Sequence, residues 1–198
     1  MAARKLAITG GKVIDPAQGI DRVADVLISN GSIESVTDSS TGSSYDGYES
    51  VEATGKIVSP GFVDLHTHLR DPGQEWKETI ITGTRAAAHG GFTTVCAMPN
   101  TDPVQDSAAV VGDVMRRSAA DGVVRVLPIG AISIGQHGKQ LALMGELADA
   151  GVIGFSDDGN PVTNANLMRQ ALAYSVEFGM PIINHAEDKK IGAGGVMS

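Results

Sequence analysis

Two histidines and an arginine stand where their side chains could do metal chemistry. His66 and His68 form a His-x-His pair at the end of the apolar run 62–65. Because side chains alternate faces along a strand, both imidazoles should point the same way, as a preformed half of a metal site. Arg70 continues the i, i+2, i+4 series and would present a guanidinium fork to a carboxylate. The alternative is that these are unrelated polar residues leaving a strand.

Further ligand-type residues follow later apolar runs: Asn100, Asp157, Asp158 and His185. The carboxyl ends of parallel strands all lie on one face of a barrel, so these residues should converge with the His-x-His pair. Three histidines and a carboxylate suit zinc, and a carboxylate can also bridge two ions.

Each of these residues has a simpler interpretation when it is taken alone. Asp157-Asp158-Gly159 could be a plain turn, and His185 could be a buried histidine with an ordinary hydrogen-bond partner. Asn100 could shape the turn before a helix. His89 and His137 are interpreted as non-ligands. The joint placement of four ligand-type groups on one face favours the metal site.

The elements that would position these groups repeat about every thirty residues, the length of one βα unit. Apolar strands are expected at 62–65, 93–97, 123–128, 152–155 and 181–184. Helices are expected at 75–89 (opened by Trp76, a packing residue), 103–120 (capped by Asp102), 139–150 and 164–178 (capped by Thr163). The pattern predicts a parallel sheet covered by helices, an α/β fold. Five strands are rather more than half of a (β/α)₈ barrel.

Residues before Pro60-Gly61 have a different pattern. Short β-strands are expected at 6–9, 12–14, 25–29, 32–36, 51–53 and 56–58, with Asn30-Gly31 as a hairpin turn and residues 38–50 as a polar loop. We therefore expect one domain over 1–58 and a second over 59–198.

Composition limits the class of protein and its partners. The 198 residues carry a net charge of −8 with no basic cluster, which argues against nucleic acid or a membrane as the main partner. The single cysteine, Cys96, rules out an internal disulfide, and we expect it to be buried. With no signal-like or membrane-spanning run, a cytoplasmic protein is expected.

Four motifs in order make the sequence similar to a known family. They are Pro-Gly-Phe-Val-Asp-Leu-His-Thr-His-Leu-Arg-Asp-Pro-Gly, Gly-Gly-Phe-Thr-Thr-Val-Cys-Ala-Met-Pro-Asn-Thr, Gly-Phe-Ser-Asp-Asp-Gly and His-Ala-Glu-Asp. Over essentially the whole chain they resemble the long bacterial (type I) dihydroorotases of the amidohydrolase superfamily. The resemblance implies the first five strands of a metal-dependent hydrolase (β/α)₈ TIM barrel. It also implies that residues 1–58 are the N-terminal part of a small β-sandwich domain.

The resemblance also implies roles for particular residues. His66 and His68 match the ligands of one metal ion, His185 a ligand of a second, and Asp158 the carboxylate shared between them. One or two Zn²⁺ ions would be bound. Arg70 and Asn100, together with His68, match residues that bind the substrate.

The implied reaction is the reversible cyclisation of N-carbamoyl-L-aspartate to L-dihydroorotate in pyrimidine biosynthesis, by a metal-bound hydroxide. Related hydantoinases and allantoinases use a carboxylated lysine as the bridge, and the run 152–158 has no lysine. Such a cyclic-amide hydrolase remains an alternative, as does an inactive, truncated or scaffold subunit.

The resemblance covers the N-terminal portion of the family pattern. The family's catalytic aspartate, a further metal histidine and the rest of the barrel would lie beyond Ser198, so no catalytic residue is expected within this chain. We expect the C-terminal half to be supplied by a second chain, and a half-barrel alone to aggregate. A homo-oligomer, and association with aspartate carbamoyltransferase, are further expectations from the family.

Overall fold

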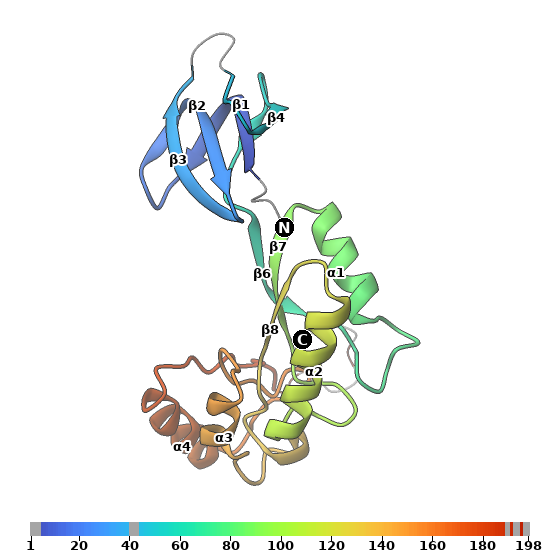
Figure 1. Ribbon diagram of the computed structural model, residues 1–198. Coiled ribbons are helices and arrows are strands. Elements are labelled where there is room, and N and C mark those ends of the chain that lie inside the picture. Colours follow the sequence, from blue (N-terminus) through green and yellow to red (C-terminus); the bar gives the residue numbers. More distant parts are fainter. Residues whose placement is uncertain (1–4, 40–43, 189–190, 192–194, 196–198) are drawn as a thin grey trace. The chain divides into compact units, whose positions relative to one another are not determined.

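The computed structural model describes residues 5–39, 44–188, 191 and 195 (Figure 1). The chain divides into two compact units, residues 1–60 and 61–198. Part of the predicted loop at 38–50 (residues 40–43) lies outside the described residues.

The first unit is a five-stranded sheet with the order β3-β2-β1-β4, in which β5 also pairs with β1. Strands β1, β2 and β3 are antiparallel neighbours, whereas β4 and β5 run parallel to β1. The hairpin predicted at Asn30-Gly31 is present, since both residues have positive φ as a tight turn between twisted strands requires. The strands are β1 (Lys5–Asp15), β2 (Ile20–Ser29), β3 (Ser32–Asp38), β4 (Glu49–Glu52) and β5 (Ile57–Val58).

Two strands predicted within residues 6–14 form the single strand β1, which carries a bulge. The register with β2 shifts between Ile8 and Gly11, and Gly10 has φ +73°. The buried Asp25 accepts a hydrogen bond from the Gly10 amide (2.8 Å) and one from the Tyr45 hydroxyl (3.0 Å). A buried carboxylate therefore satisfies the backbone group that the bulge frees.

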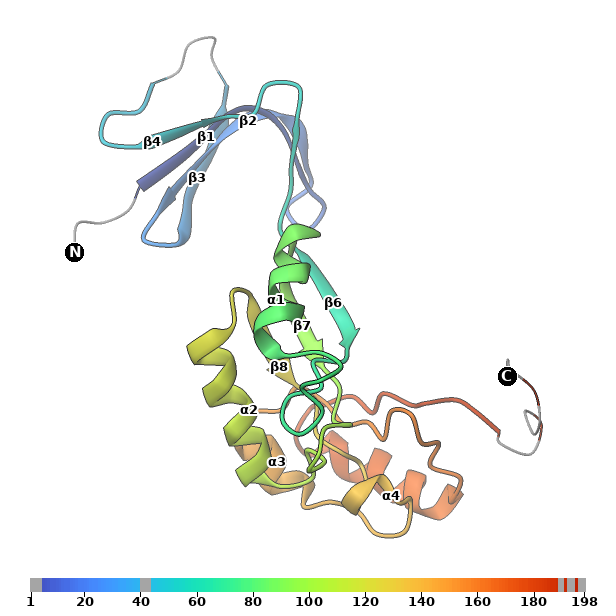
Figure 2. The same cartoon turned by 90° about the vertical axis from the view of Figure 1, so that its right-hand side faces the viewer.

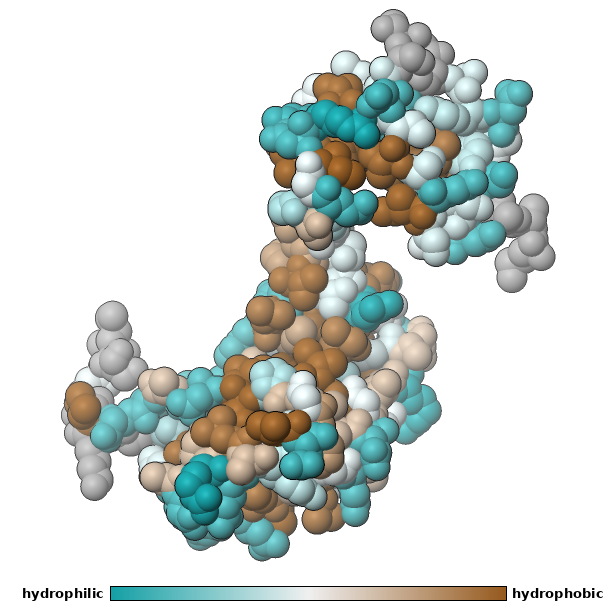
Figure 3. Space-filling model, turned by 90° about the vertical axis from the view of Figure 1, so that its left-hand side faces the viewer, coloured by the Kyte–Doolittle hydropathy of each residue, from teal (hydrophilic) through white to brown (hydrophobic). Residues whose placement is uncertain are grey.

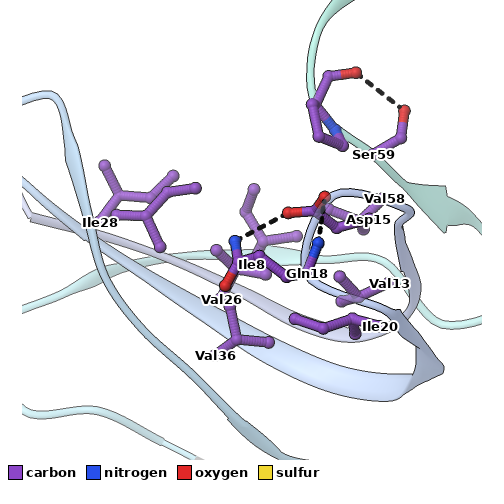
Figure 4. Close-up of a pocket in the computed structure, with 12 residues that line it drawn as sticks. Ile8, Val13, Asp15, Gln18, Ile20, Val26, Ile28, Val36, Val58 and Ser59 are labelled. Carbon is purple, nitrogen blue, oxygen red and sulfur yellow. Dashed lines mark hydrogen bonds between the residues drawn. The ribbon is translucent and has the colours of Figure 1, made fainter.

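One face of this sheet carries an apolar groove of about 130 Å³. Branched aliphatic side chains line it, and Figure 4 shows them beside the polar rim of Asp15, Gln18 and Ser59. In Figure 3 brown hydrophobic side chains gather on this unit. Its apolar lining residues are Ile8, Val13, Ile20, Val26, Ile28, Ile33, Val36 and Val58.

The second unit is built on three parallel strands in the order β6-β7-β8. They are β6 (Phe62–Thr67), β7 (Phe92–Ala97) and β8 (Arg125–Pro128). The predicted strands at 152–155 and 181–184 form only single parallel bridges, Gly130 to Phe155 and Phe155 to Ile182. The spatial order still follows the chain order, so the carboxyl ends of all five segments lie on one side.

The helices are α1 (Ile80–His89), α2 (Ala108–Asp121), α3 (Met144–Asp149) and α4 (Ala165–Val176), with a short 3₁₀ turn at Ile134–Gln136. Figures 1 and 2 show α1 and α2 on the same side of the three-stranded sheet. No helix of the described residues is long and apolar enough to cross a lipid bilayer.

All four predicted helix starts were wrong. Helix α3 begins at Met144 and not at residue 139, because residues 140–142 pair with the segment 132–134. Local capping and loop hydrogen bonds explain the other three differences. Helix α1 begins after Thr79, whose hydroxyl and backbone form a capping box with Thr82, and not at residue 75. Helix α2 begins after Ser107, because residues 99–105 are held in a loop by their own hydrogen bonds. Asn164, not Thr163, caps α4.

Two expectations about single side chains had opposite outcomes. Trp76 lies in the loop before α1 and is 76% exposed, so the packing role predicted for it is wrong. Cys96 is buried in β7, as expected, and burial together with the charge of Asp64 raises the pKa of its thiol.

Candidate metal site

The carboxylate of Asp158 lies among three histidine rings. Its Oδ1 lies 3.4 Å from His66 Nε2 and 3.3 Å from His185 Nδ1, and its Oδ2 lies 3.4 Å from His68 Nε2. The Asp158 side chain is 8% exposed, whereas the three histidine side chains are 30–50% exposed. Residues more than a hundred positions apart are therefore brought together at one end of the sheet, as the strand-end argument predicts.

The ligand-type atoms of His66, His68 and Asp158 all lie within 4.8 Å of one another. His185 contacts Asp158 but is outside this three-residue group, and its Nε2 lies 3.3 Å from Glu187 Oε2. Asp158 thus has the two-histidine group on one side and His185 as a further neighbour. This arrangement fits one ion held by the group, or two ions that share the carboxylate.

Asp157 and Asp158, which follow the segment 152–155, have different environments. Asp157 is buried and accepts hydrogen bonds from the backbone amides of Ile132 (2.8 Å) and Ser133 (3.0 Å), and from the Ser133 hydroxyl. Burial raises the pKa of the Asp157 carboxyl, against the opposing effect of these hydrogen bonds. Asp157 therefore holds the loop after β8, and only Asp158 faces the histidines.

Asn100 follows β7 and contacts two members of the group. Its Oδ1 lies 2.9 Å from His68 Nδ1, and its Nδ2 lies 3.4 Å from Asp158 Oδ2. The Asn100 carbonyl accepts a hydrogen bond from Gln74 Nε2 (3.1 Å), and the Gln74 amide donates to the Arg70 carbonyl (2.9 Å). The loop before α1 is thereby tied to the loop after β7.

The spacing of Arg70 predicts that it continues the alternation of the strand. This prediction was wrong. Strand β6 ends at Thr67, and Arg70 has φ +60°, the left-handed region that breaks an i, i+2, i+4 series. Among the described residues no side chain forms a hydrogen bond or ion pair with its guanidinium. The group is thus available to an anion, on a loop and not on the strand.

The chemistry of the donor set fits a cation. Carboxylate oxygens only accept hydrogen bonds, and a neutral imidazole nitrogen without a proton also only accepts. At each of the three histidine–Asp158 contacts, a ring nitrogen lies 3.3–3.4 Å from a carboxylate oxygen. Imidazole nitrogen with carboxylate oxygen is a ligand set of zinc, so these residues would fit a divalent ion.

Sequence reasoning missed the residues that support the group. Gln74 and Gln136 stand in loops without a motif, and Gln136 Nε2 donates to the Asp158 carbonyl (3.3 Å). The one signal in the sequence for Gln136 was its place between Gly135 and Gly138, which marks a turn. In the structure Gln136 has φ +56°, which is uncommon for a residue other than glycine. His89 and His137, predicted as non-ligands, are outside the three-residue group.

Comparison with known proteins places this geometry in a family. A family model described as dihydro-orotase-like matches residues 55–198. The chain is 49% identical over 193 residues to a dihydroorotase of Geobacter metallireducens, and 52% identical over 192 residues to one of Anaeromyxobacter sp. strain K. These alignments cover 98% and 97% of this chain but 45% and 44% of the relatives, so the chain spans just under half their length.

Solved structures support the same type of fold. L-hydantoinase from Arthrobacter aurescens superposes with a TM-score of 0.77 at 20% identity, over 94% of this chain and 41% of that one. Dihydropyrimidinase from Brevibacillus agri gives a TM-score of 0.74 at 23% identity, over 93% and 40%. At these identities the likeness concerns the mixed α/β fold alone. With the family model covering residues 55–198, the chain belongs to the dihydro-orotase-like family.

Proposed function

We propose that this chain is the metal-binding N-terminal part of a dihydroorotase, which converts N-carbamoyl-L-aspartate to L-dihydroorotate reversibly. The observation that carries the proposal is the meeting of His66, His68 and His185 around the one carboxylate of Asp158. The dihydroorotases at about 50% identity supply the substrate and the reaction.

His66, His68, Asp158 and His185 would hold one or two Zn²⁺ ions, with Asp158 shared if there are two. Zinc supplies a Lewis acid that polarises an amide carbonyl and makes water a nucleophile at neutral pH. The backbone of the buried Asp158 is held in place, because its amide donates to Ser156 Oγ (3.0 Å) and its carbonyl accepts from Gln136 Nε2. Its carboxylate is thereby directed at the histidines.

Arg70 and Asn100 would bind the substrate's α-carboxylate beside this group, with His68. A planar guanidinium that has no partner within the described chain can offer two parallel N–H donors to a carboxylate. One N–H of the Asn100 amide faces Asp158 and the other remains for a ligand. Together they would fix which face of the substrate meets the metal group.

The proton-transferring carboxylate would come from the further part that the longer relatives carry, in the same chain or in a second one. We extend this proposal to the fold. Strands β6, β7 and β8 and the two bridged segments would be the first five strands of a (β/α)₈ barrel. Residues 1–58 would be part of a β-sandwich whose remaining strands cover the apolar groove. A cytoplasmic location, a homo-oligomer and an aspartate carbamoyltransferase partner stay predictions.

Two alternatives make different predictions. A hydantoinase-like enzyme would use a carboxylated lysine as the bridge between its metal ions. The run 152–158 has no lysine, and Asp158 stands there instead. A scaffold subunit without activity would have no need for three histidines to meet at one carboxylate.

The deciding experiment joins this chain to the C-terminal remainder of the Geobacter metallireducens relative. We expect the purified chimera to contain zinc and to hydrolyse L-dihydroorotate, and the His66→Ala variant to lose both. The matched control is His89→Ala, which removes a histidine outside the group and should change neither. A folded, zinc-containing chimera that hydrolyses hydantoin and not dihydroorotate would support the hydantoinase alternative. A folded chimera without zinc or turnover would support the scaffold.

A further inference from the structure

We infer that Gln74 is a positioning residue for carboxylate recognition, because it joins the loop that carries Arg70 to the loop that carries Asn100. The inference rests on the proposed function, in which Arg70 and Asn100 bind the substrate's α-carboxylate. The two residues follow different strands, β6 and β7. A carboxylate that contacts both of them is bound well only if the two loops keep a fixed separation.

On one side, Gln74 closes the loop after β6 into a turn. Its backbone amide donates a hydrogen bond to the Arg70 carbonyl at 2.9 Å. Arg70 has φ +60°, a backbone conformation that a residue with a side chain keeps only where its surroundings hold it. The hydrogen bond from Gln74 is part of that support, so a displacement of Gln74 would also move the start of the arginine side chain.

On the other side, the Gln74 side chain reaches the loop after β7. Its Nε2 donates to the Asn100 carbonyl at 3.1 Å, and its Oε1 accepts from Lys77 Nζ at 3.0 Å. Because a lysine ammonium only donates, the oxygen of the Gln74 amide must face Lys77 and its NH₂ group must face Asn100. Gln74 therefore holds the backbone of Arg70 and of Asn100 without occupying the side chain of either.

Two backbone contacts hold the same pair of loops together at a neighbouring point. The Asp102 amide donates to the Pro72 carbonyl at 3.0 Å, and Gly73 lies so close to the Asp102 carbonyl that a Cβ atom would have no room there. Removal of the Gln74 amide should thus leave the loops folded but able to shift where the carboxylate would bind. We expect a selective loss of affinity for the carboxylate and no loss of the fold.

The test compares two ligands that differ by one carboxylate. N-carbamoyl-L-aspartate carries the α-carboxylate, and N-carbamoyl-β-alanine is the same molecule without it. Each is titrated into the full 198-residue chain with ¹⁵N-labelled arginine, in EDTA so that no metal ion binds the carboxylate, and in about 0.15 M salt to screen unspecific attraction. NMR follows the Arg70 Nε–H signal, assigned by its loss in Arg70→Lys, and gives both dissociation constants.

The variants separate the two hydrogen bonds of the Gln74 amide. Gln74→Met keeps the volume of the side chain and loses both bonds. Gln74→Glu keeps an acceptor for Lys77 but has no donor for Asn100, whereas Lys77→Met removes only the partner of Oε1. The matched control is Gln170→Met, the same change at an exposed position of α4.

We expect the unsubstituted chain, Lys77→Met and Gln170→Met to prefer N-carbamoyl-L-aspartate, with a shift of the Arg70 Nε–H signal. Gln74→Met and Gln74→Glu should bind this ligand about three- to tenfold more weakly, as the loss of one hydrogen bond predicts, with the affinity for N-carbamoyl-β-alanine unchanged.

The inference is overturned if Gln74→Met keeps the preference, or if it loses affinity for both ligands equally, as general loosening of the fold would cause. Should Gln74→Met not fold, an unchanged preference in Gln74→Glu would overturn it. An unsubstituted chain without any preference also overturns it, while zinc content and turnover of the chimera still decide the proposed function. A preference in this chain without turnover in the chimera would defeat the proposed function alone.

Discussion

Asp157 and Asp158 are neighbours in the sequence with different tasks in the structure. Successive side chains at the end of an extended segment point to opposite sides. Asp157 consequently turns toward the backbone amides of Ile132 and Ser133, and Asp158 toward the histidines. The Ser133 hydroxyl also accepts from the Gly138 amide at 2.8 Å, so Asp157 orders the whole loop after β8.

Replacing each aspartate with asparagine should separate stability from metal binding. Asp157→Asn loses charge-assisted hydrogen bonds in a buried place, and we expect the free energy of unfolding to fall by about 1–3 kcal/mol in urea titrations with EDTA. Asp158→Asn should leave that free energy nearly unchanged but weaken zinc binding more than about 100-fold. This loss is larger than the one expected on removing a residue that only supports a metal ligand. Equal losses of zinc affinity in both variants would contradict this division.

At the scale of elements, the loop between β6 and α1 is fastened by residues distant in sequence. Arg117 on α2 contacts Asp71 (3.0 Å), Glu75 (3.9 Å) and, one turn back, Asp113 (2.7 Å). On the other side Gly73, with φ +92°, lies against the Asp102 carbonyl, where a Cβ atom would come within 1.7 Å. The loop that carries Arg70 is therefore held from two directions, which explains why helix did not form from residue 75.

The ion pairs of Arg117 can be tested against those of its neighbour. Arg116 pairs with Asp113 (2.5 Å) but has no contact with the loop. Because Arg117 is 41% exposed, we expect its pairs to contribute only about 1 kcal/mol. Arg117→Met should speed hydrogen exchange of the Gly73, Gln74 and Ile80 amides about fivefold. In Arg116→Met these amides should exchange as in the unsubstituted chain. Equal rates in the two variants would show that Asp71 holds the loop without Arg117.

The convergence of four side chains could be predicted from the sequence better than the bounds of the elements. The meeting of His66, His68, Asp158 and His185 follows from parallel strands alone, because their carboxyl ends lie on one side regardless of exact lengths. Arg70 and the start of α1 could not be predicted this way. Both depend on Asp71, Arg117 and Gln74, contacts between distant residues that override local periodicity. The segments at 152–155 and 181–184 are apolar, yet they form isolated bridges, Gly130 to Phe155 and Phe155 to Ile182, and not full strands.

At the scale of the whole molecule, each unit exposes apolar side chains. In the second unit β6 pairs with β7 alone among the described strands, and Phe62 and Leu65 are 57% and 68% exposed. In the first unit the aliphatic groove lies on one sheet face. Apolar surface on an unpaired parallel strand favours association with further chain of the same protein or with copies of itself.

Substitution on the open strand should lower self-association without loss of stability. We expect Leu65→Thr to reduce concentration-dependent light scattering of the 198-residue chain, with the free energy of unfolding changed by no more than about 0.5 kcal/mol. Val95→Thr, on the neighbouring strand but buried, should lower that free energy by about 1–3 kcal/mol. If Leu65→Thr destabilises as much as Val95→Thr, the strand is already covered within the chain.

The spacing of the three histidines also sets an order of events during synthesis. His66 and His68 leave the ribosome together, whereas Asp158 and His185 follow about a hundred residues later, several seconds at ordinary elongation rates. In that interval only the two-histidine half of the proposed metal site exists, and it would offer a metal two imidazoles. Coordination by all four proposed ligands would require the long-range contacts of the sheet, which are the slow part of folding such a topology. Stable metal binding would therefore come late in folding, and only in chains whose distant segments have already come together.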